Sequence, residues 1–187
     1  MLSPGVIVDI ELFAHWIFSH ANYGGPVTLY LVRHAAAGHR SPFDNDLDLD
    51  LDRQLNDVGH EQAAALTEFF AQMSVRSVWS SLATRCFQTV RPIAAHHGLE
   101  VVPQHFLTEG ARPVDFLEAL RAESSLKGDL VLCSHGDLIP EVVSRLLREG
   151  MTVVGPRGCE KGSVWSLETR GRDIVRASYT ARPVSPG

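Results

Sequence analysis

The chain has 187 residues, of which 44% are hydrophobic and 21% charged, a composition typical of one globular domain with a sizeable buried core. Its formal net charge of −5 offers no positive surface for nucleic acid or anionic lipid, so an anionic substrate must be attracted by a local cluster of positive charge. No apolar run approaches the roughly 20 residues of a membrane span, and we expect neither a membrane nor a nucleic acid as partner.

The first part of the chain, residues 1–26, is predicted to be an extension that precedes the domain. Its apolar segment is interrupted by Asp9 and Glu11, and it lacks both the basic start and the cleavage site of a signal peptide. A chain-breaking stretch rich in glycine and proline follows. The domain is therefore expected to cover residues 27–182, with a short tail over residues 183–187.

From residue 27 onward, short apolar runs alternate with patterns of helical period. The predicted strands are residues 27–32, 77–80, 101–103 and 129–134, followed by a hairpin of residues 163–168 and 174–179. The predicted helices are residues 56–73, 82–97, 113–123 and 140–148. Asn56 is the expected cap of the first helix, and Gly98 the residue that ends the second. The pattern favours an α/β fold, a three-layer sandwich with a mostly parallel central sheet flanked by helices and an antiparallel C-terminal edge hairpin.

Two histidines and two arginines follow the predicted strands. Arg33 and His34 end the first strand, His135 follows the strand 129–134, and Arg85 stands in the first turn of a helix. Each alone is more often a structural or solvated residue. Because ligands of open α/β sheets bind beyond the carboxyl ends of parallel strands, we expect the four side chains to share one pocket.

The chemistry of these four side chains suits a phosphoryl group. Guanidinium groups bind phosphate oxygens in pairs, and a helix N-terminus favours an anion. A neutral imidazole can attack phosphorus, which makes His34 a candidate nucleophile. His135 is expected to donate to the phosphoryl oxygens, charged or nearly so beside an anion.

Four motifs, in order along the chain, resemble those of the histidine phosphatase superfamily. LVRHAAAG at residues 31–38 is similar to the RHG signature, with Ala35 in place of the usual glycine. Residues 52–63 resemble the helix start D-R-x-L-(T/N)-x-x-G-x-x-Q-A, residues 80–89 the segment S-S-x-x-x-R-x-x-Q-T, and CSHGD at residues 133–137 the second histidine motif. The resemblance covers about residues 27–179. It is closest to small SixA-type phosphohistidine phosphatases and to the phosphatase domains fused to some Nudix hydrolases, the latter through KGSVWSL at residues 161–167.

This resemblance implies a metal-independent phosphatase without a cofactor, in which His34 forms a covalent phosphohistidine. Arg33, Arg85 and His135 would form the phosphate pocket, with His135 also part of the catalytic set. Glu109, after the third strand, is the candidate general acid and base, with Asp137 in reserve, although SixA-type enzymes act without this glutamate. The implied substrates are phosphomonoesters or phosphoramidates, either small molecules or a phosphohistidine protein, and a homodimer is left open.

Two other functions remain as alternatives at this stage. A phosphotransferase like phosphoglycerate mutase would need further groups to hold a phosphorylated product, and the chain is short of residues for such a lid. A non-catalytic module that binds phosphorylated ligands would not need the nucleophile His34.

Three further features are given structural interpretations. In residues 44–52 every second residue is acidic, but the glycine and distal glutamate of an EF-hand are missing, so a solvated loop beside the pocket that influences substrate choice is expected. His39 and Arg40 could line the entrance, although ordinary solvent exposure is favoured. The pair at residues 96–97 is expected to end a helix and not to bind a metal.

The three cysteines, Cys86, Cys133 and Cys159, have neither the number nor the spacing of a disulfide framework or a metal site. Free thiols in a reducing cytoplasm are therefore predicted. Cys86 and Cys133 stand in apolar contexts and are expected in the core.

Overall fold

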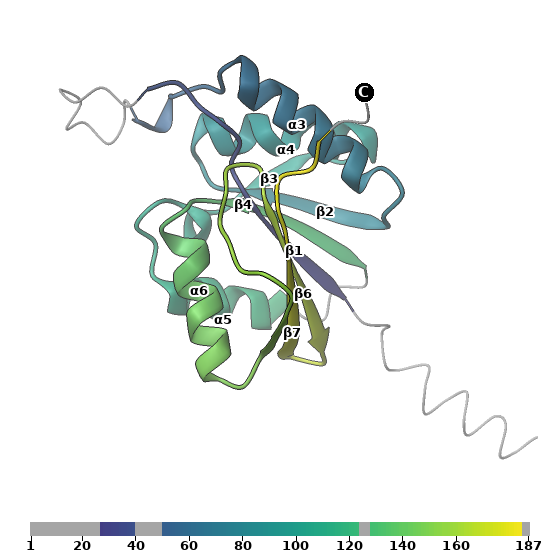
Figure 1. The fold of residues 1–187 in the computed structure, drawn as a ribbon, viewed down its shortest axis with the longest axis vertical. Coiled ribbons are helices and arrows are strands. Elements are labelled where there is room, and N and C mark those ends of the chain that lie inside the picture. The colour runs from purple at the N-terminus through teal and green to yellow at the C-terminus, as the bar shows by residue number, and fades with distance from the viewer. Residues whose placement is uncertain (1–26, 40–49, 124–127, 185–187) are drawn as a thin grey trace, which may run out of the picture.

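The computed structural model describes residues 27–39, 50–123 and 128–184 (Figure 1). The predicted N-terminal extension, Arg40 and the first three aspartates of the acidic run lie outside these ranges. Within them, no helix is long and apolar enough to cross a bilayer.

A seven-stranded sheet in the order β3-β2-β4-β1-β6-β7-β5 forms the centre of the described structure (Figure 1). The strands are β1 (Thr28–Arg33), β2 (Val75–Ser80), β3 (Val101–Pro103), β4 (Asp129–Ser134), β5 (Thr152–Val154), β6 (Val164–Arg170) and β7 (Asp173–Thr180). Strand β6 pairs antiparallel with both β1 and β7, while all other pairings are parallel. The α/β fold class is confirmed. The short strand β5 was not predicted, and it adds one strand outside the β6–β7 hairpin.

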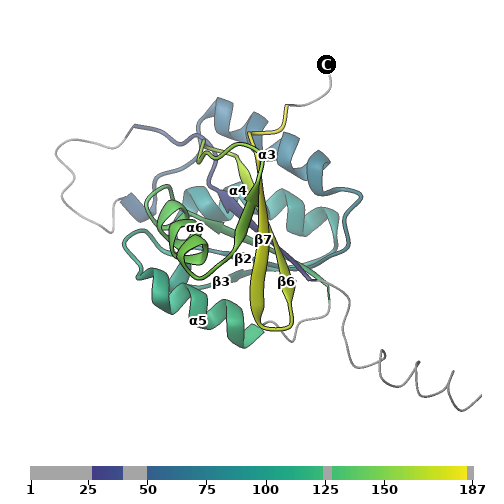
Figure 2. The same cartoon turned by 60° about the horizontal axis from the view of Figure 1, so that its bottom comes forward.

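Helices cover both faces of the sheet, which gives the predicted three layers (Figures 1 and 2). Helices α3 (Asp57–Phe70) and α4 (Thr84–His96) lie on one face, and α5 (Pro113–Glu123) and α6 (Leu138–Arg148) on the other. Strand β1 shows why its four central residues are apolar. Leu29 and Leu31 pack with α5 and α6, whereas Tyr30 and Val32 pack with α3 and α4.

The ends of the helices follow from local chemistry. Asn56 caps α3 as predicted, because its side-chain oxygen accepts the N–H of Gly59 at 2.9 Å. Gly98 follows α4 with a φ of +66°, the left-handed conformation that glycine adopts most readily. Helix α6 begins two residues earlier than predicted, directly after Asp137.

Three parallel strands end level with one another, and this register positions the site. Arg33 of β1 is paired with Ser134 of β4, and Ser80 of β2 with Cys133. Beyond the last pair the backbones remain bonded, since the His34 N–H donates to Ser134 O at 3.0 Å. The residues that follow β1 and β4 are therefore neighbours, although far apart in the sequence.

Candidate active site

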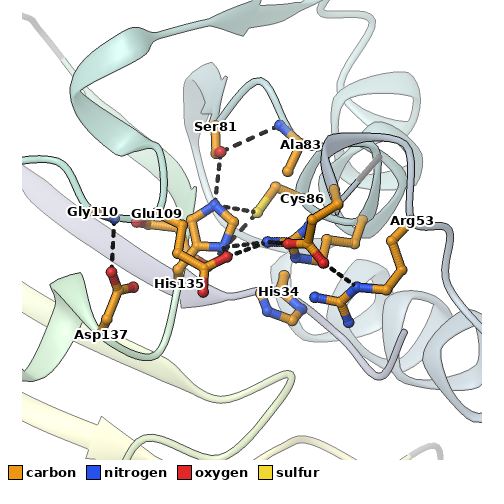
Figure 3. Close-up of polar contacts among 12 residues, drawn as sticks. His34, Arg53, Ser81, Ala83, Cys86, Glu109, Gly110, His135 and Asp137 are labelled. Carbon is orange, nitrogen blue, oxygen red and sulfur yellow. Dashed lines mark hydrogen bonds and ion pairs between the residues drawn. The ribbon is translucent and has the colours of Figure 1, made fainter. Parts of the chain in front are cut away.

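The carboxyl edge of β1, β4 and β2 brings together the side chains that the sequence singled out (Figure 3). His34 and His135 face each other with ring centroids 5.4 Å apart. Arg85, in the first turn of α4, reaches the same place with its guanidinium group. The exposed fractions of these three side chains are 6%, 2% and 1%, so the cluster is nearly withdrawn from solvent.

His34 is held as a neutral imidazole. Its Nδ1 lies 2.8 Å from the carbonyl oxygen of Ala35, which can only accept, so Nδ1 carries the proton and Nε2 keeps its lone pair. Burial lowers the pKa of His34 to about 3; the hydrogen bond to Ala35 opposes this shift, and the charges of neighbouring cations add to it. A neutral ring with a free Nε2 is the form that a nucleophile requires.

His135 is fixed from two sides. Its Nε2 lies 2.7 Å from Ser81 Oγ, and its Nδ1 lies 3.3 Å from Arg85 Nη2. Because a guanidinium group can only donate, Nδ1 accepts in this arrangement and Nε2 donates to the serine. The serine hydroxyl also accepts the backbone N–H of Ala83 at 3.3 Å, which links His135 to the start of α4 (Figure 3).

The two arginines are partly satisfied by the protein. Arg85 donates to the carbonyl oxygen of Asp50 at 2.7 Å and to Glu109 Oε2 at 2.7 Å. Arg33 donates from Nη1 to the carbonyl oxygen of Cys159, and its guanidinium lies flat against Gly136, where a Cβ would come within 2.5 Å of it. The buried Nε of each arginine has no hydrogen-bond partner within the described part of the chain. Such donors fit an oxyanion bound between them.

The candidate acid Glu109 lies at the open side of the cluster, 44% exposed. Its Oε2 is 4.0 Å from His135 Nδ1, so it borders the phosphate pocket and solvent at once. It also lines a hollow of about 510 Å³ together with residues on both sides of it in the sequence, among them Phe106 and Arg112. The reserve candidate Asp137 has a different place. Its Oδ2 accepts the N–H of Gly110 at 2.8 Å and so supports the loop that carries Glu109.

The prediction of a solvated acidic loop is wrong for Asp50. This residue is 7% exposed, and its carboxylate lies 3.1 Å from Arg85 Nη2 and 2.9 Å from Arg53 Nε. The two arginines offer it charge compensation that a local sequence pattern does not reveal. Asp52, two residues later, is exposed as expected.

Sequence reasoning also missed three residues beside the cluster. Arg53 donates to the carbonyl oxygen of Gly38 at 3.2 Å, and its guanidinium is turned toward His34 (Figure 3). Lys161 lies in the same loop as Cys159, whose carbonyl oxygen accepts a hydrogen bond from Arg33. The Cys86 thiol lies 3.5 Å from His135 Nε2. The D-R-x-L and KGSVWSL segments were noticed only as motifs, without a role for their basic residues.

The cysteines behave largely as predicted. Cys86 and Cys133 are buried, Cys159 is partly exposed, and all are free thiols. Burial alone would raise the pKa of the Cys86 thiol, but hydrogen bonds with Cys133 and His135 lower it to about 6.

The structure also describes His39 and the pair at residues 96–97. His39 is exposed, and the His97 ring contacts the carbonyl oxygen of Phe70 at 3.2 Å. In the described ranges, histidine, cysteine and carboxylate side chains nowhere form a group that could hold a metal ion.

Comparisons with known proteins agree with this picture. The family model of the histidine phosphatase superfamily (branch 1) matches residues 29–111, which include Arg33, His34, Arg85 and Glu109. The 8-oxo-(d)GTP phosphatase of Mycolicibacterium smegmatis is 29% identical over 159 residues, which are 83% of this chain and 48% of that protein. The chain thus spans about half the length of this relative. Over residues 29–111 the chain is therefore similar to the histidine phosphatase superfamily, and the relative it matches is a phosphatase.

Solved structures show the same fold. The protein histidine phosphatase SixA in complex with tungstate superposes with a TM-score of 0.64 at 16% identity, covering 84% of this chain and 96% of SixA. The SixA protein of Agrobacterium tumefaciens gives a TM-score of 0.61 at 21% identity and covers 82% and 97% of the two chains. A mycobacterial glucosyl-3-phosphoglycerate phosphatase in complex with VO3 gives 0.58 at 18% identity over 84% and 99%.

Proposed function

We propose that this protein is a phosphatase of the histidine phosphatase superfamily that hydrolyses phosphomonoesters or phosphoramidates through a covalent phosphohistidine on His34, without a metal ion. The observation that carries the proposal is the state of His34. Its Nδ1 proton is bound to the Ala35 carbonyl at 2.8 Å, so Nε2 keeps its lone pair near the buried Arg85 and the half-buried Arg33. These cations would hold the phosphoryl oxygens and neutralise their charge as the group transfers.

In the first step, the lone pair of His34 Nε2 attacks phosphorus while the bond from phosphorus to the leaving oxygen or nitrogen breaks. Glu109, in its protonated form, donates its proton to the leaving atom. In the structure, Arg85 Nη2 lies 2.7 Å from the Glu109 carboxylate. The incoming phosphoryl group takes the place of this carboxylate on Arg85. When both ring nitrogens are protonated, His135 would donate from Nδ1 to a phosphoryl oxygen in place of its present contact with Arg85 Nη2.

In the second step, water attacks the phosphohistidine. The Glu109 carboxylate accepts a proton from this water as its oxygen bonds to phosphorus, and the bond from phosphorus to Nε2 breaks. Inorganic phosphate leaves, and both His34 and Glu109 return to their starting forms. The exposed position of Glu109 gives water a route to it.

The substrate is proposed from chemistry and from relatives. A phosphorylated small molecule and a phosphohistidine protein both fit the phosphate cluster. The Mycolicibacterium smegmatis relative is an 8-oxo-(d)GTP phosphatase, which makes phosphorylated nucleotides the first small molecules to test. The resemblance to SixA structures extends to the fold, and phosphohistidine proteins are the second class to test. A homodimer and a cytoplasmic location stay predictions.

The decisive experiment measures phosphate release from an aryl phosphate in the presence of EDTA. We expect the wild-type protein to turn over and His34→Ala to lose at least about a hundredfold in kcat/KM. His39→Ala, an exposed histidine five residues later, is the matched control and should keep wild-type activity. Rapid quenching with labelled substrate should trap phosphate on the wild type and not on His34→Ala.

Other outcomes separate the alternatives. Equal activity of wild type and His34→Ala would refute the assignment of His34. Ligand binding by His34→Ala with no wild-type turnover on any substrate would support a binding module. An isomerised product in place of inorganic phosphate would support a phosphotransferase.

A further inference from the structure

The loop of residues 158–163 lies against the nucleophile segment. The N–H of Gly162 donates to the carbonyl oxygens of Arg33 and His34 at 3.0 and 3.3 Å, and the carbonyl oxygen of Ser163 accepts the Arg33 N–H at 3.0 Å. These bonds continue the β1–β6 pairing beyond its last ladder pair, Val32 with Val164. The residue just before Gly162 is Lys161, so its backbone is placed beside the start of the phosphate cluster.

The same loop is anchored at its other end. The indole N–H of Trp165 donates to Gly158 O at 2.9 Å, and the hydroxyl of Tyr179 accepts the N–H of Glu160 at 3.2 Å. Gly158 packs so closely on Tyr179 that a Cβ would come within 2.6 Å of the ring. Gly162 has a φ of +77°, which favours glycine at the position next to Lys161. Because the loop is held at both ends, the backbone position from which the Lys161 side chain extends is fixed.

Lys161 is a half-buried cation that forms no ion pair with the residues that the structure describes. No carboxylate of the described residues lies within ion-pair distance of it, and the two carboxylates of the cluster, Asp50 and Glu109, are bound by arginines. Burial lowers the pKa of the Lys161 ammonium, and three nearby guanidinium groups lower it further. Those groups belong to Arg33, Arg53 and Arg85. Like charges gathered in this way are unfavourable unless an anion joins them.

A single phosphoryl group does not account for all these cations. Its three peripheral oxygens can be satisfied by the free donors of Arg33 and Arg85 together with His135. Lys161 is then left over for a second anionic group on the substrate. The nearest such group is a phosphate joined directly to the scissile one.

We propose that Lys161 is a specificity residue that binds this second phosphate, and that the preferred substrates are phosphoanhydrides such as nucleoside 5′-diphosphates. The inference rests on the proposed function. In the reaction, the bond from His34 Nε2 to the terminal phosphorus forms, and the bond from that phosphorus to the bridging oxygen breaks. The bridging oxygen keeps the electron pair as part of the departing monophosphate, whose charge Lys161 stabilises. Water then releases inorganic phosphate from His34 as above.

The test compares a nucleoside 5′-diphosphate with the matching 5′-monophosphate. Lys161→Met should lower the ratio of the two kcat/KM values, diphosphate over monophosphate, by roughly tenfold to a hundredfold, the loss typical of a charge-assisted contact. Lys161→Arg should restore most of the ratio. Arg157→Met removes a positive charge from an exposed position at the start of the same loop and should leave the ratio unchanged.

A binding experiment keeps the inference independent of turnover. In His34→Ala protein, adding Lys161→Met should weaken the binding of the diphosphate, measured by calorimetry, by a similar factor and that of the monophosphate much less. An unchanged ratio, or equal losses for both nucleotides, would overturn the role of Lys161. A wild type that hydrolyses no phosphate ester would instead refute the proposed function, while the calorimetric comparison would still decide the role of Lys161.

Discussion

At the scale of single residues, Arg85 and Arg53 share one buried carboxylate, that of Asp50. Asp50 binds Arg85 with one oxygen at 3.1 Å and Arg53 with the other at 2.9 Å, and its backbone carbonyl accepts a second bond from Arg85. A guanidinium fixed at two edges presents its remaining N–H groups in a set direction. Asp50 is therefore a positioning residue, since it acts through the arginines.

Replacing Asp50 should loosen the phosphate pocket. We expect Asp50→Asn to lower kcat/KM for an aryl phosphate by roughly tenfold to a hundredfold, because a displacement of about 1 Å in a positioning group has costs of this size. The inhibition constant for inorganic phosphate should weaken in parallel, an effect that a general loss of stability would not produce in folded protein. Asp52→Asn, an exposed neighbour, serves as control. Wild-type kinetics in Asp50→Asn would contradict this role.

At the scale of elements, helix α3 packs directly on the segment that follows His34. A Cβ on Gly59 would stand 1.9 Å from the carbonyl oxygen of Ala36, and that same oxygen accepts the N–H of Asn56 at 3.1 Å. Gln62 completes the contact, since its Oε1 accepts the Ala36 N–H at 2.8 Å. The N-cap and the second turn of α3 thus hold the backbone C=O and N–H of Ala36, two residues beyond His34.

This contact predicts a large effect from one methyl group. Gly59→Ala should lower the free energy of unfolding by about 3 kcal/mol, because the clash involves backbone that cannot move aside without shifting the helix. Urea unfolding measures the change directly. Gly38→Ala is the matched control, since its Cβ would meet nothing closer than Gln54 O at 3.9 Å, and we expect a change within about 1 kcal/mol. Similar losses in the two variants would refute the proposed clash.

At the scale of the whole molecule, the buried His34 makes stability depend on pH. The pKa of His34 is about 3 in the folded protein, against an ordinary value of 6.5. Between these values the unfolded chain binds a proton that the folded chain excludes, so the free energy of unfolding rises with pH in this window. The stabilising contribution is complete above pH 6.5 and is lost as the pH falls towards 3.

The consequence can be isolated by comparing variants. Between about pH 7 and about pH 4.5, wild type should lose roughly 2 kcal/mol more of its unfolding free energy than His34→Gln, which has no group to titrate there. His96→Gln, which removes an exposed histidine, should lose as much as the wild type. Urea titrations at the two pH values provide the comparison. An equal pH dependence in wild type and His34→Gln would show that His34 is not buried as a neutral ring.

The fold and the candidate site differ in how much of each could be predicted from the sequence. The alternation of apolar runs and helical patterns predicted the α/β class, because strand residues buried on both faces of a sheet, such as the four central residues of β1, must be apolar. Strand β5 escaped prediction because three residues carry no periodic signal, and only its pairing with β7 makes them a strand.

The sequence by itself determined which residues could carry the chemistry. Strand ends and ordered motifs singled out Arg33, His34, Arg85 and His135, and the register of parallel strands requires such ends to meet. Only the tertiary structure decided how they are supported. Asp50 is buried because the guanidinium of Arg85, 35 residues later, compensates its charge. Lys161 lies near the arginines because its loop is hydrogen-bonded to the carboxyl end of β1. Local sequence records the charge of a side chain, but its burial and its partners arise from contacts between segments that are distant along the chain.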